Sequence, residues 1–316
     1  MNKRVKALIL AGIMMVSMVG CGKQTENKKE SNETKITLIL DEGGVNDQSF
    51  NQSAWEGALK AEKELGVEVS YLESEQEADY MQNIETAIDN DSDLIVGVGF
   101  KLTETIGEAS QNYPEQKFAI IDGNYEEIPS NVQPILFNEE ESGYLVGLIA
   151  AKMTETKKVG FVGGMDIPSV TNFFIGFEKA IKEVDPTIEV SKQYINSFTD
   201  AAKGKAISNQ MIKDGVDIVF TAAGGGNNGV FESTKEQNKY AIGVDMPSSY
   251  IAPDVVITSA LKNVGTGVEL TIKDLIEENF KGGEVKMFDL SNEGVGYEDT
   301  KLLPQEVKDF VKSKIQ

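Results

Sequence analysis

Several residue types are missing or scarce in this chain, and each shortage excludes a class of function. The chain has no histidine, which excludes a Ser-His-Asp triad, a Cys-His dyad and a histidine-ligated zinc site. Its one cysteine, Cys21, allows neither an intramolecular disulfide nor a thiolate metal cluster. Its one arginine is Arg4, although phosphate and carboxylate ligands usually recruit arginine forks. We therefore expect no metal site and a ligand without such an acidic group.

Basic residues are also scarce relative to acidic ones. The 316 residues include 30 Lys and Arg against 51 Asp and Glu, which gives a formal net charge of −21. A chain this acidic would be repelled by the phosphates of a nucleic acid, so we expect no nucleic-acid partner. The 40% of hydrophobic residues supply enough apolar material for two cores, and 30 glycines against 8 prolines indicate many tight turns.

The N-terminus has the pattern of an export signal. Positive charges within residues 3–6 are followed by an apolar run over residues 5–20 that is too short for a good bilayer-spanning helix. Cys21 follows directly and resembles the lipidated cysteine of a bacterial lipobox, although Met18 stands where leucine is usual. We expect a signal peptide over residues 1–20 and a lipid on Cys21, which would anchor the chain at the extracytoplasmic face of the cell membrane. The alternative is an ordinary secretory signal with an incidental cysteine.

The segment after Cys21 reads as a tether. The stretch from Gly22 to Thr34 has no apolar residue and should be solvated and flexible. Loss of residues 1–20 would leave 27 basic residues against 51 acidic ones, a formal charge of −24. The anionic body would therefore be held at the membrane by its lipid and not by its own charge.

From residue 35 onward, short apolar runs alternate with amphipathic segments. This alternation is typical of an α/β fold with parallel sheets covered by helices on both faces. The expected strands are 36–40, 68–72, 94–98, 118–121, 132–137, 158–162, 190–194, 218–221, 240–244, 255–259 and 285–290. The expected helices are 52–65, 79–88, 102–111, 140–153, 173–183, 201–214, 229–237, 264–280 and 304–314.

Two halves of this pattern look alike. In each, a first strand leads through a Gly-containing turn to a phenylalanine and a helix, with Phe50 in one half and Phe173 in the other. A later strand of each half ends at an aspartate, Asp122 or Asp245. We therefore predict two similar doubly wound lobes joined by short hinge crossings, which could close on a ligand.

In open parallel sheets, ligands bind outside the carboxyl ends of the strands. The residues expected at those ends include aromatic rings, carboxylates, small glycine turns and one amine. They are Asn46, Asp47, Phe50, Asp122, Gly163, Gly164, Phe198, the run 222–229, Asp245 and Lys262. Aromatic faces stack on rings, and carboxylates accept hydrogen bonds from hydroxyl groups. The set suits a neutral, polyhydroxylated ligand with a flat ring.

Each of these residues also has a purely structural interpretation. An aspartate after a strand can serve as a helix N-cap, and a phenylalanine before a helix can belong to the core. The run 139–141 of three glutamates is expected to be a solvated first turn of a helix. Joint placement at one rim is what favours the ligand-binding interpretation.

One motif formally matches a dinucleotide fingerprint. Gly224, Gly226 and Gly229 follow a strand and open a helix, and Asp245 comes 21 residues after the first of them. The motif falls on a late strand, however, and an exported chain has no cytosolic cofactor pool. We therefore expect no cofactor, and we expect these glycines to let backbone amides approach a ligand directly.

Four segments carry a family resemblance. Residues 41–57 (DEGGVNDQSFNQSAWEG), 162–177, 222–232 and 256–263 (VITSALKN) resemble the basic membrane protein family. Its members are lipid-anchored, nucleoside-binding receptors of bacterial ABC importers with the type I periplasmic-binding fold. The resemblance covers nearly the whole chain after the signal, and it implies purine nucleosides as the substrate class.

The resemblance also implies roles by position. Phe50 and Phe198 would sandwich the base, with Phe173 beside it. Base edges would be recognised, or the near lobe closed, by Asn46, Asp47 and Asp122. The ribose would be held by Gly224, Asp245 and Lys262. After Asp245 this chain continues with Met246-Pro247-Ser248, where members of the family often have an acidic residue and glutamine.

We therefore predict a binding protein and not an enzyme: a lipoprotein that captures inosine, guanosine or adenosine and delivers it to an ABC transporter permease. We expect a monomer with lobe 1 at 35–138 plus 257–281 and lobe 2 at 139–256 plus 282–316. A receptor for a sugar or another small polar ligand is the first alternative. A nucleoside-processing enzyme is the second, and Asp41 with Asp47 is too sparse a pair for the metal cluster that it would need.

Overall fold

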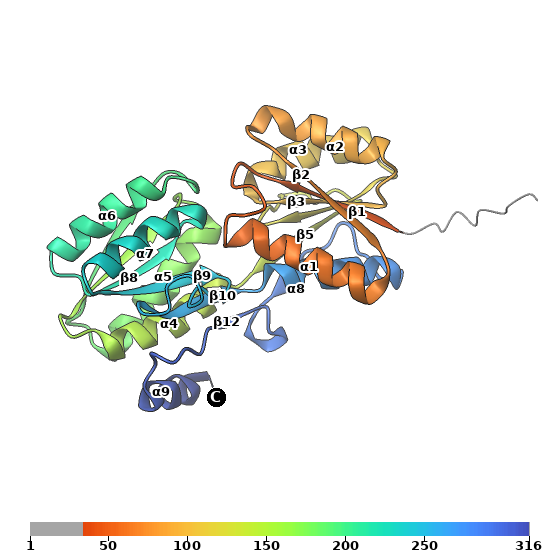
Figure 1. The fold of residues 1–316 in the computed structure, drawn as a ribbon. Helices are drawn as coiled ribbons and strands as arrows, with labels where there is room; N and C mark the ends of the chain where they lie inside the picture. Colours follow the sequence, from red (N-terminus) through yellow and green to blue (C-terminus); the bar gives the residue numbers. More distant parts are fainter. Residues whose placement is uncertain (1–33, 316) are drawn as a thin grey trace, which may run out of the picture. The chain divides into compact units, whose positions relative to one another are not determined.

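The computed structural model describes residues 34–315 (Figure 1). The predicted signal peptide, Cys21 and all but the last residue of the predicted tether lie outside the described residues. Among the described residues, no helix combines the length and the apolar character needed to cross a membrane.

The first sheet is entirely parallel. Its strands lie in the order β11 (Lys286–Phe288), β5 (Val132–Phe137), β4 (Lys117–Ile121), β3 (Leu94–Val98), β1 (Lys35–Leu40) and β2 (Glu68–Glu73). One face is covered by α1 (Phe50–Leu65) and α8 (Val264–Ile276), and the other by α2 (Tyr80–Asp89) and α3 (Thr103–Asn112) (Figure 1). Because both faces are covered, every residue of the central strand β3 is buried. The strand β2 lies at the edge of the sheet and is mostly exposed. We call this sheet and its helices lobe 1.

The second sheet repeats this arrangement. Its strands lie in the order β12 (Val295–Tyr297), β10 (Val256–Lys262), β9 (Tyr240–Asp245), β8 (Ile218–Ala222), β6 (Lys158–Gly163) and β7 (Glu189–Tyr194). All neighbours are parallel except β12, which pairs antiparallel with β10. The helices are α4 (Glu139–Met153), α5 (Pro168–Val184), α6 (Ala201–Lys213), α7 (Asn227–Glu236) and α9 (Gln305–Ile315). We call this sheet and its helices lobe 2.

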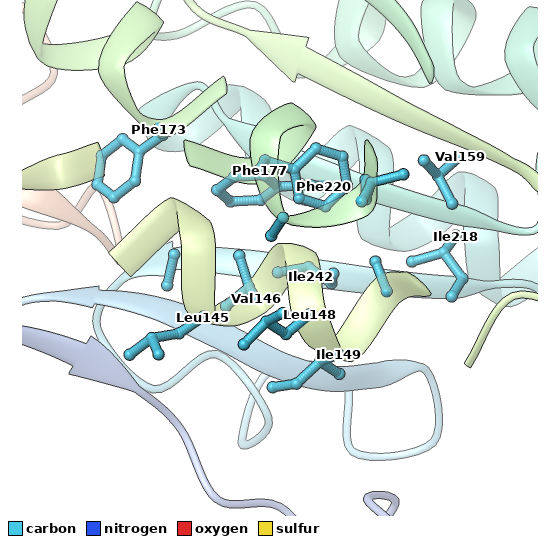
Figure 2. Close-up of a cluster of buried hydrophobic side chains, with 14 of the residues drawn as sticks. Leu145, Val146, Leu148, Ile149, Val159, Phe173, Phe177, Ile218, Phe220 and Ile242 are labelled. Atoms are coloured by element: carbon cyan, nitrogen blue, oxygen red, sulfur yellow. The ribbon is translucent and has the colours of Figure 1, made fainter. Parts of the chain in front are cut away.

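The largest of the core clusters among the described residues of lobe 2 lies between its sheet and the helix pair α4 and α5 (Figure 2). Phe220 of β8 packs edge-on against Phe173 and at a tilt against Phe177, both from α5, with ring centroids 6.1 and 5.2 Å apart. The helix α4 adds an almost wholly apolar turn around Leu148. Gly143 and Gly147 of α4 let the two helices approach closely, because an added Cβ would lie 2.1 Å and 2.5 Å from carbonyl oxygens of α5.

Within residues 34–315 the chain passes between the sheets three times, as expected. The first crossing is at Asn138, after which α4 packs on α5 of lobe 2; the second is at Asn263, after which α8 packs on α1 of lobe 1. The third runs over residues 289–294, between β11 and β12.

The expected lobe boundaries at 257 and 282 differ from these crossings. Strand β10 pairs with β9 and so belongs to lobe 2, while β11 pairs with β5 and so belongs to lobe 1. An apolar strand sequence does not indicate which sheet supplies its partner, and this is why the expected boundaries fell six residues too early at the second crossing and at least seven too early at the third.

Candidate functional site

A pocket of about 590 Å³, counting its open mouth, lies between the two lobes. Lobe 1 contributes Asp41, Gly43, Asp47, Phe50, Asn51, Gly99, Phe100 and Asp122. Lobe 2 contributes Ile167, Ser169, Val170, Phe173, Phe198, Ala222, Gly224, Val244, Asp245 and Lys262.

The lining residues sit at or just after the carboxyl ends of β1, β3, β4, β6, β7, β8, β9 and β10. Eight of the nine predicted ligand-binding residues are among them; the ninth, Asn46, is exposed and lies outside the pocket lining. Its loop turns the side chain to solvent while its neighbour Asp47 turns inward, so we remove Asn46 from the candidate site.

Asp47 holds the start of α1. Its carboxylate accepts hydrogen bonds from the backbone N–H groups of Ser49, Asn51 and Gln52, at 2.9, 2.9 and 3.1 Å. Burial raises the pKa of Asp47 to about 6, although these three donors act in the opposite direction. The N-cap residue of α1 is Ser49, whose side chain makes no cap hydrogen bond, and Asp47, two residues earlier, accepts from the first-turn N–H groups in its place. These bonds fix the direction in which Phe50 and Asn51 leave the loop.

Asp41 and Asn51 form a polar pair that the sequence prediction missed. The Asn51 amide donates to Asp41 at 2.7 Å, and the backbone N–H of Gly43 donates to the same carboxylate oxygen at 3.0 Å. Burial raises the pKa of Asp41. The oxygen of the Asn51 side-chain amide (Oδ1) is buried and has no hydrogen-bond partner within the described chain. Asp41 directly follows β1, so the strand-end rule applied to Asp122 and Asp245 would have found it.

Glycines position the ring of Phe198. An added Cβ on Gly164 would lie 2.3 Å from the Phe198 ring, a distance that real Cβ contacts do not reach. Gly224 has a φ of +56°, a backbone conformation that favours glycine, and its Cα faces the Phe198 backbone. Phe198 and Phe50 are half-buried, whereas Phe173 is almost fully buried in the lobe 2 core and reaches the pocket from there.

Lys262 lies at the base of the pocket in a buried ion cluster. Its ammonium contacts both carboxylate oxygens of Asp122, at 2.7 and 2.6 Å, and one oxygen of Glu139, at 2.9 Å. It also lies 5.3 Å from the ring centre of Phe50 and 5.2 Å from that of Phe137. Burial alone lowers the pKa of Lys262, but the carboxylates of Asp122, Glu139 and Asp245 raise it above its ordinary value.

Glu139 corrects one expectation. We expected the glutamate run 139–141 to be a solvated helix turn, but Glu139 is only 3% exposed because Lys262 draws it inward. Glu140 does remain partly exposed, beside Lys179.

Asp245 contacts the opposite lobe. The Ser49 hydroxyl, at the start of α1, donates to the Asp245 carboxylate. Burial raises the pKa of Asp245 to about 7, although Lys262 and Ser49 act in the opposite direction. Asp122 and Asp245 have positive φ angles of +62° and +63° at equivalent positions in the two lobes. Such strained backbone is concentrated at functional sites.

The pocket therefore combines aromatic faces with an excess of hydrogen-bond acceptors. Among the lining residues of the described chain, Lys262 is the only cation, while Asp41, Asp47, Asp122 and Asp245 are potential anions. Such a wall favours a neutral ligand that donates hydrogen bonds, and it repels phosphate.

The family model for "ABC transporter substrate-binding protein PnrA-like" (Bmp) matches residues 34–316. The chain belongs to the Bmp family. A CD4+ T-cell-stimulating antigen of Listeria monocytogenes is 37% identical, over 94% of this chain and 90% of its own length. The nucleoside-binding protein BmpA of an ABC transporter in Lactococcus lactis is 35% identical, over 93% and 91%. An ABC transporter solute-binding protein from Aeropyrum pernix superposes with a TM-score of 0.79 at 32% identity, covering 89% of this chain and 85% of its own.

Membership in the Bmp family settles the class of function. The chain is a substrate-binding protein of an ABC transporter. This confirms the prediction that the chain is a binding protein and not an enzyme. The match to solute-binding structures also confirms the predicted type I periplasmic-binding architecture of two doubly wound lobes.

Proposed function

We propose that this Bmp protein binds a purine nucleoside between its lobes and hands it to the permease of its transporter. The observation that carries the proposal is a pocket that combines the ring of Phe50 from lobe 1 and the ring of Phe198 from lobe 2 with buried acceptors and a single ammonium. A nucleoside offers a flat base for stacking and hydroxyl groups that donate to carboxylates. The name of the Lactococcus lactis relative, a nucleoside-binding protein, agrees with this substrate class.

The proposed roles follow the two chemical halves of the ligand. Phe50 and Phe198 stack on the base, and the edge of the base faces acceptors at Asp41, Asn51 and Asp122. The ribose hydroxyls meet Asp245, Lys262 and the backbone at Gly224. Asp47 acts mainly by fixing the start of α1, and Phe173 closes the apolar wall beside the base.

The charge of the pocket indicates which form of the ligand enters. A nucleotide would bring a phosphate next to Asp122 and Asp245, where Lys262 already has carboxylate partners. We therefore expect the site to accept nucleosides and to reject their monophosphates.

Calorimetry of the full chain tests the proposal against inosine, guanosine, adenosine, cytidine, ribose and inosine 5′-monophosphate. We expect purine nucleosides to bind, the monophosphate to bind at least about tenfold more weakly, and ribose alone not to bind. Tight binding of ribose alone would favour a sugar receptor, and release of free base from inosine would indicate an enzyme.

We further propose that the protein acts as a monomer held at the extracytoplasmic face of the membrane by a lipid on Cys21. The name of a relative in Pyrococcus abyssi that is 34% identical describes a lipoprotein. Metabolic labelling with radioactive palmitate should mark the wild-type chain and not Cys21→Ala, which should appear in the soluble fraction. Equal labelling of both would exclude this anchor, and a dimer in sedimentation velocity would exclude the monomer.

A further inference from the structure

Lys262 has two carboxylate partners, and they belong to different lobes. Asp122 follows β4 of lobe 1, whereas Glu139 is the first residue of α4 in lobe 2, the lobe that carries Lys262 itself. Motion between the lobes would therefore change the distance from Lys262 to Asp122 and leave its distance to Glu139 unaltered.

The two partners also differ in their access to the main pocket. Asp122 and Lys262 both line that pocket, and Asp122 also borders the outer groove between the lobes, whereas Glu139 borders only the groove. Glu139 is anchored there by the side-chain amide of Asn172, 3.3 Å from its second carboxylate oxygen.

The number of donors on the ammonium decides what a ligand can displace. Lys262 has three N–H donors, and they face two oxygens of Asp122 and one of Glu139. A ligand that accepts from Lys262 would replace one Asp122 oxygen, which is accessible from the pocket. Glu139 would then remain as the fixed counter-charge of a buried ammonium, which otherwise would be costly to keep charged.

We propose that Glu139 is a positioning residue for ligand binding, which holds the Lys262 ammonium at the pocket wall while Asp122 turns to the ligand or moves away with its lobe. This proposal rests on the proposed function only for the identity of the ligand. Glu139 lies next to the first interlobe crossing, and Lys262 lies next to the second. Their contact therefore also connects two of the segments that join the lobes.

The test compares Glu139→Gln with Glu140→Gln in the full chain. Both glutamates lie in the first turn of α4, so both substitutions remove the same interaction with the helix dipole, but Glu140 contacts Lys179 and not Lys262. The readouts are the affinity for inosine and the titration of Lys262, followed by the NMR signal of its labelled ε-carbon and assigned with Lys262→Arg.

We expect Glu139→Gln to lower the titration midpoint of Lys262 by about 1–3 pH units and to weaken inosine binding by about tenfold or more. Glu140→Gln should change neither, and Glu139→Asp should restore part of both effects. Wild-type values of the titration and the affinity in Glu139→Gln, with a change only in thermal stability, would overturn the proposal.

Two further outcomes keep the test decisive. If the wild-type chain binds no nucleoside, the proposed function fails, while the titration of Lys262 still decides the role of Glu139. If Glu139→Gln does not fold, the double variant Asp122→Asn/Asp245→Asn gives the answer: Lys262 should stay charged at neutral pH, because Glu139 is then the one left of the three carboxylates that raise its pKa. A neutral Lys262 in that variant would contradict the proposal.

Discussion

Gly164→Ala should weaken ligand binding indirectly, because the added methyl group displaces the ring of Phe198, which we propose stacks on the base. The new Cβ would lie 2.3 Å, 2.5 Å and 3.2 Å from three atoms of the Phe198 ring, whereas ordinary contacts begin near 3.4 Å. The ring must therefore retreat by about 1 Å or leave its place. Phe198 is half-buried and sits in a loop, so it can move without unfolding lobe 2.

The loss should equal that of one stacking contact. Removal of one stacked aromatic ring costs about 1–3 kcal/mol in base binding, which corresponds to about 5- to 150-fold in affinity. Calorimetry with inosine should show this loss for Gly164→Ala and for Phe198→Ala. The double variant should lose little more than Phe198→Ala alone, because both changes remove the same contact.

A matched control separates the ring from general damage. An added Cβ on Gly296 of β12 meets no atom within 4 Å, so Gly296→Ala should bind as the wild type does. Additive losses in the double variant, or wild-type affinity in Gly164→Ala with a folded chain, would refute the role of Phe198 as a stacking platform.

Three further predictions follow from the same contacts. Asn46→Ala should leave inosine affinity unchanged in calorimetry, because Asn46 is exposed outside the pocket; a loss would return it to the site. Lys262→Met should lower the free energy of unfolding in denaturant by about 3–5 kcal/mol, since it leaves buried carboxylates unpaired, while Lys281→Met, at the exposed pair with Glu284, should cost at most about 1 kcal/mol. Similar losses in both would contradict the buried cluster. The pKa of Asp245 is raised to about 7 in the folded chain against about 3.9 when unfolded, so the native state keeps a proton that the unfolded state releases. Its contribution to stability, up to about 4 kcal/mol, is fully present below about pH 4 and is lost as the pH rises through 7. Denaturation at several pH values should show this slope in the wild type and a flatter one in Asp245→Asn; equal slopes would exclude Asp245 as its source.

The strand and helix order was predictable because the apolar periods of this chain are regular. The same regularity made the pocket lining of each lobe predictable: the parallel strands of one sheet end at one edge, so residues that follow them, such as Asp47 and Asp122 in lobe 1, must lie near one another. The resemblance to the basic membrane protein family added the chemical roles, which periodicity alone does not provide.

The misses arise where long-range contacts override local pattern. Glu139 looks like part of a solvated charge run until Lys262, 123 residues later, is placed beside it. Asn46 and Asp47 are neighbours in a loop, and no periodicity indicates which of the two faces inward. The early placement of the second crossing has the same origin, because the partner of β10 is decided by pairing across the sheet.

A crystal structure with bound guanosine would show how the ligand lies between the lobes. We expect the base between the rings of Phe50 and Phe198, and the ribose hydroxyls within hydrogen-bond distance of Asp245 and Lys262. Guanosine bound outside the pocket between the lobes, or with its base away from both rings, would contradict this expectation.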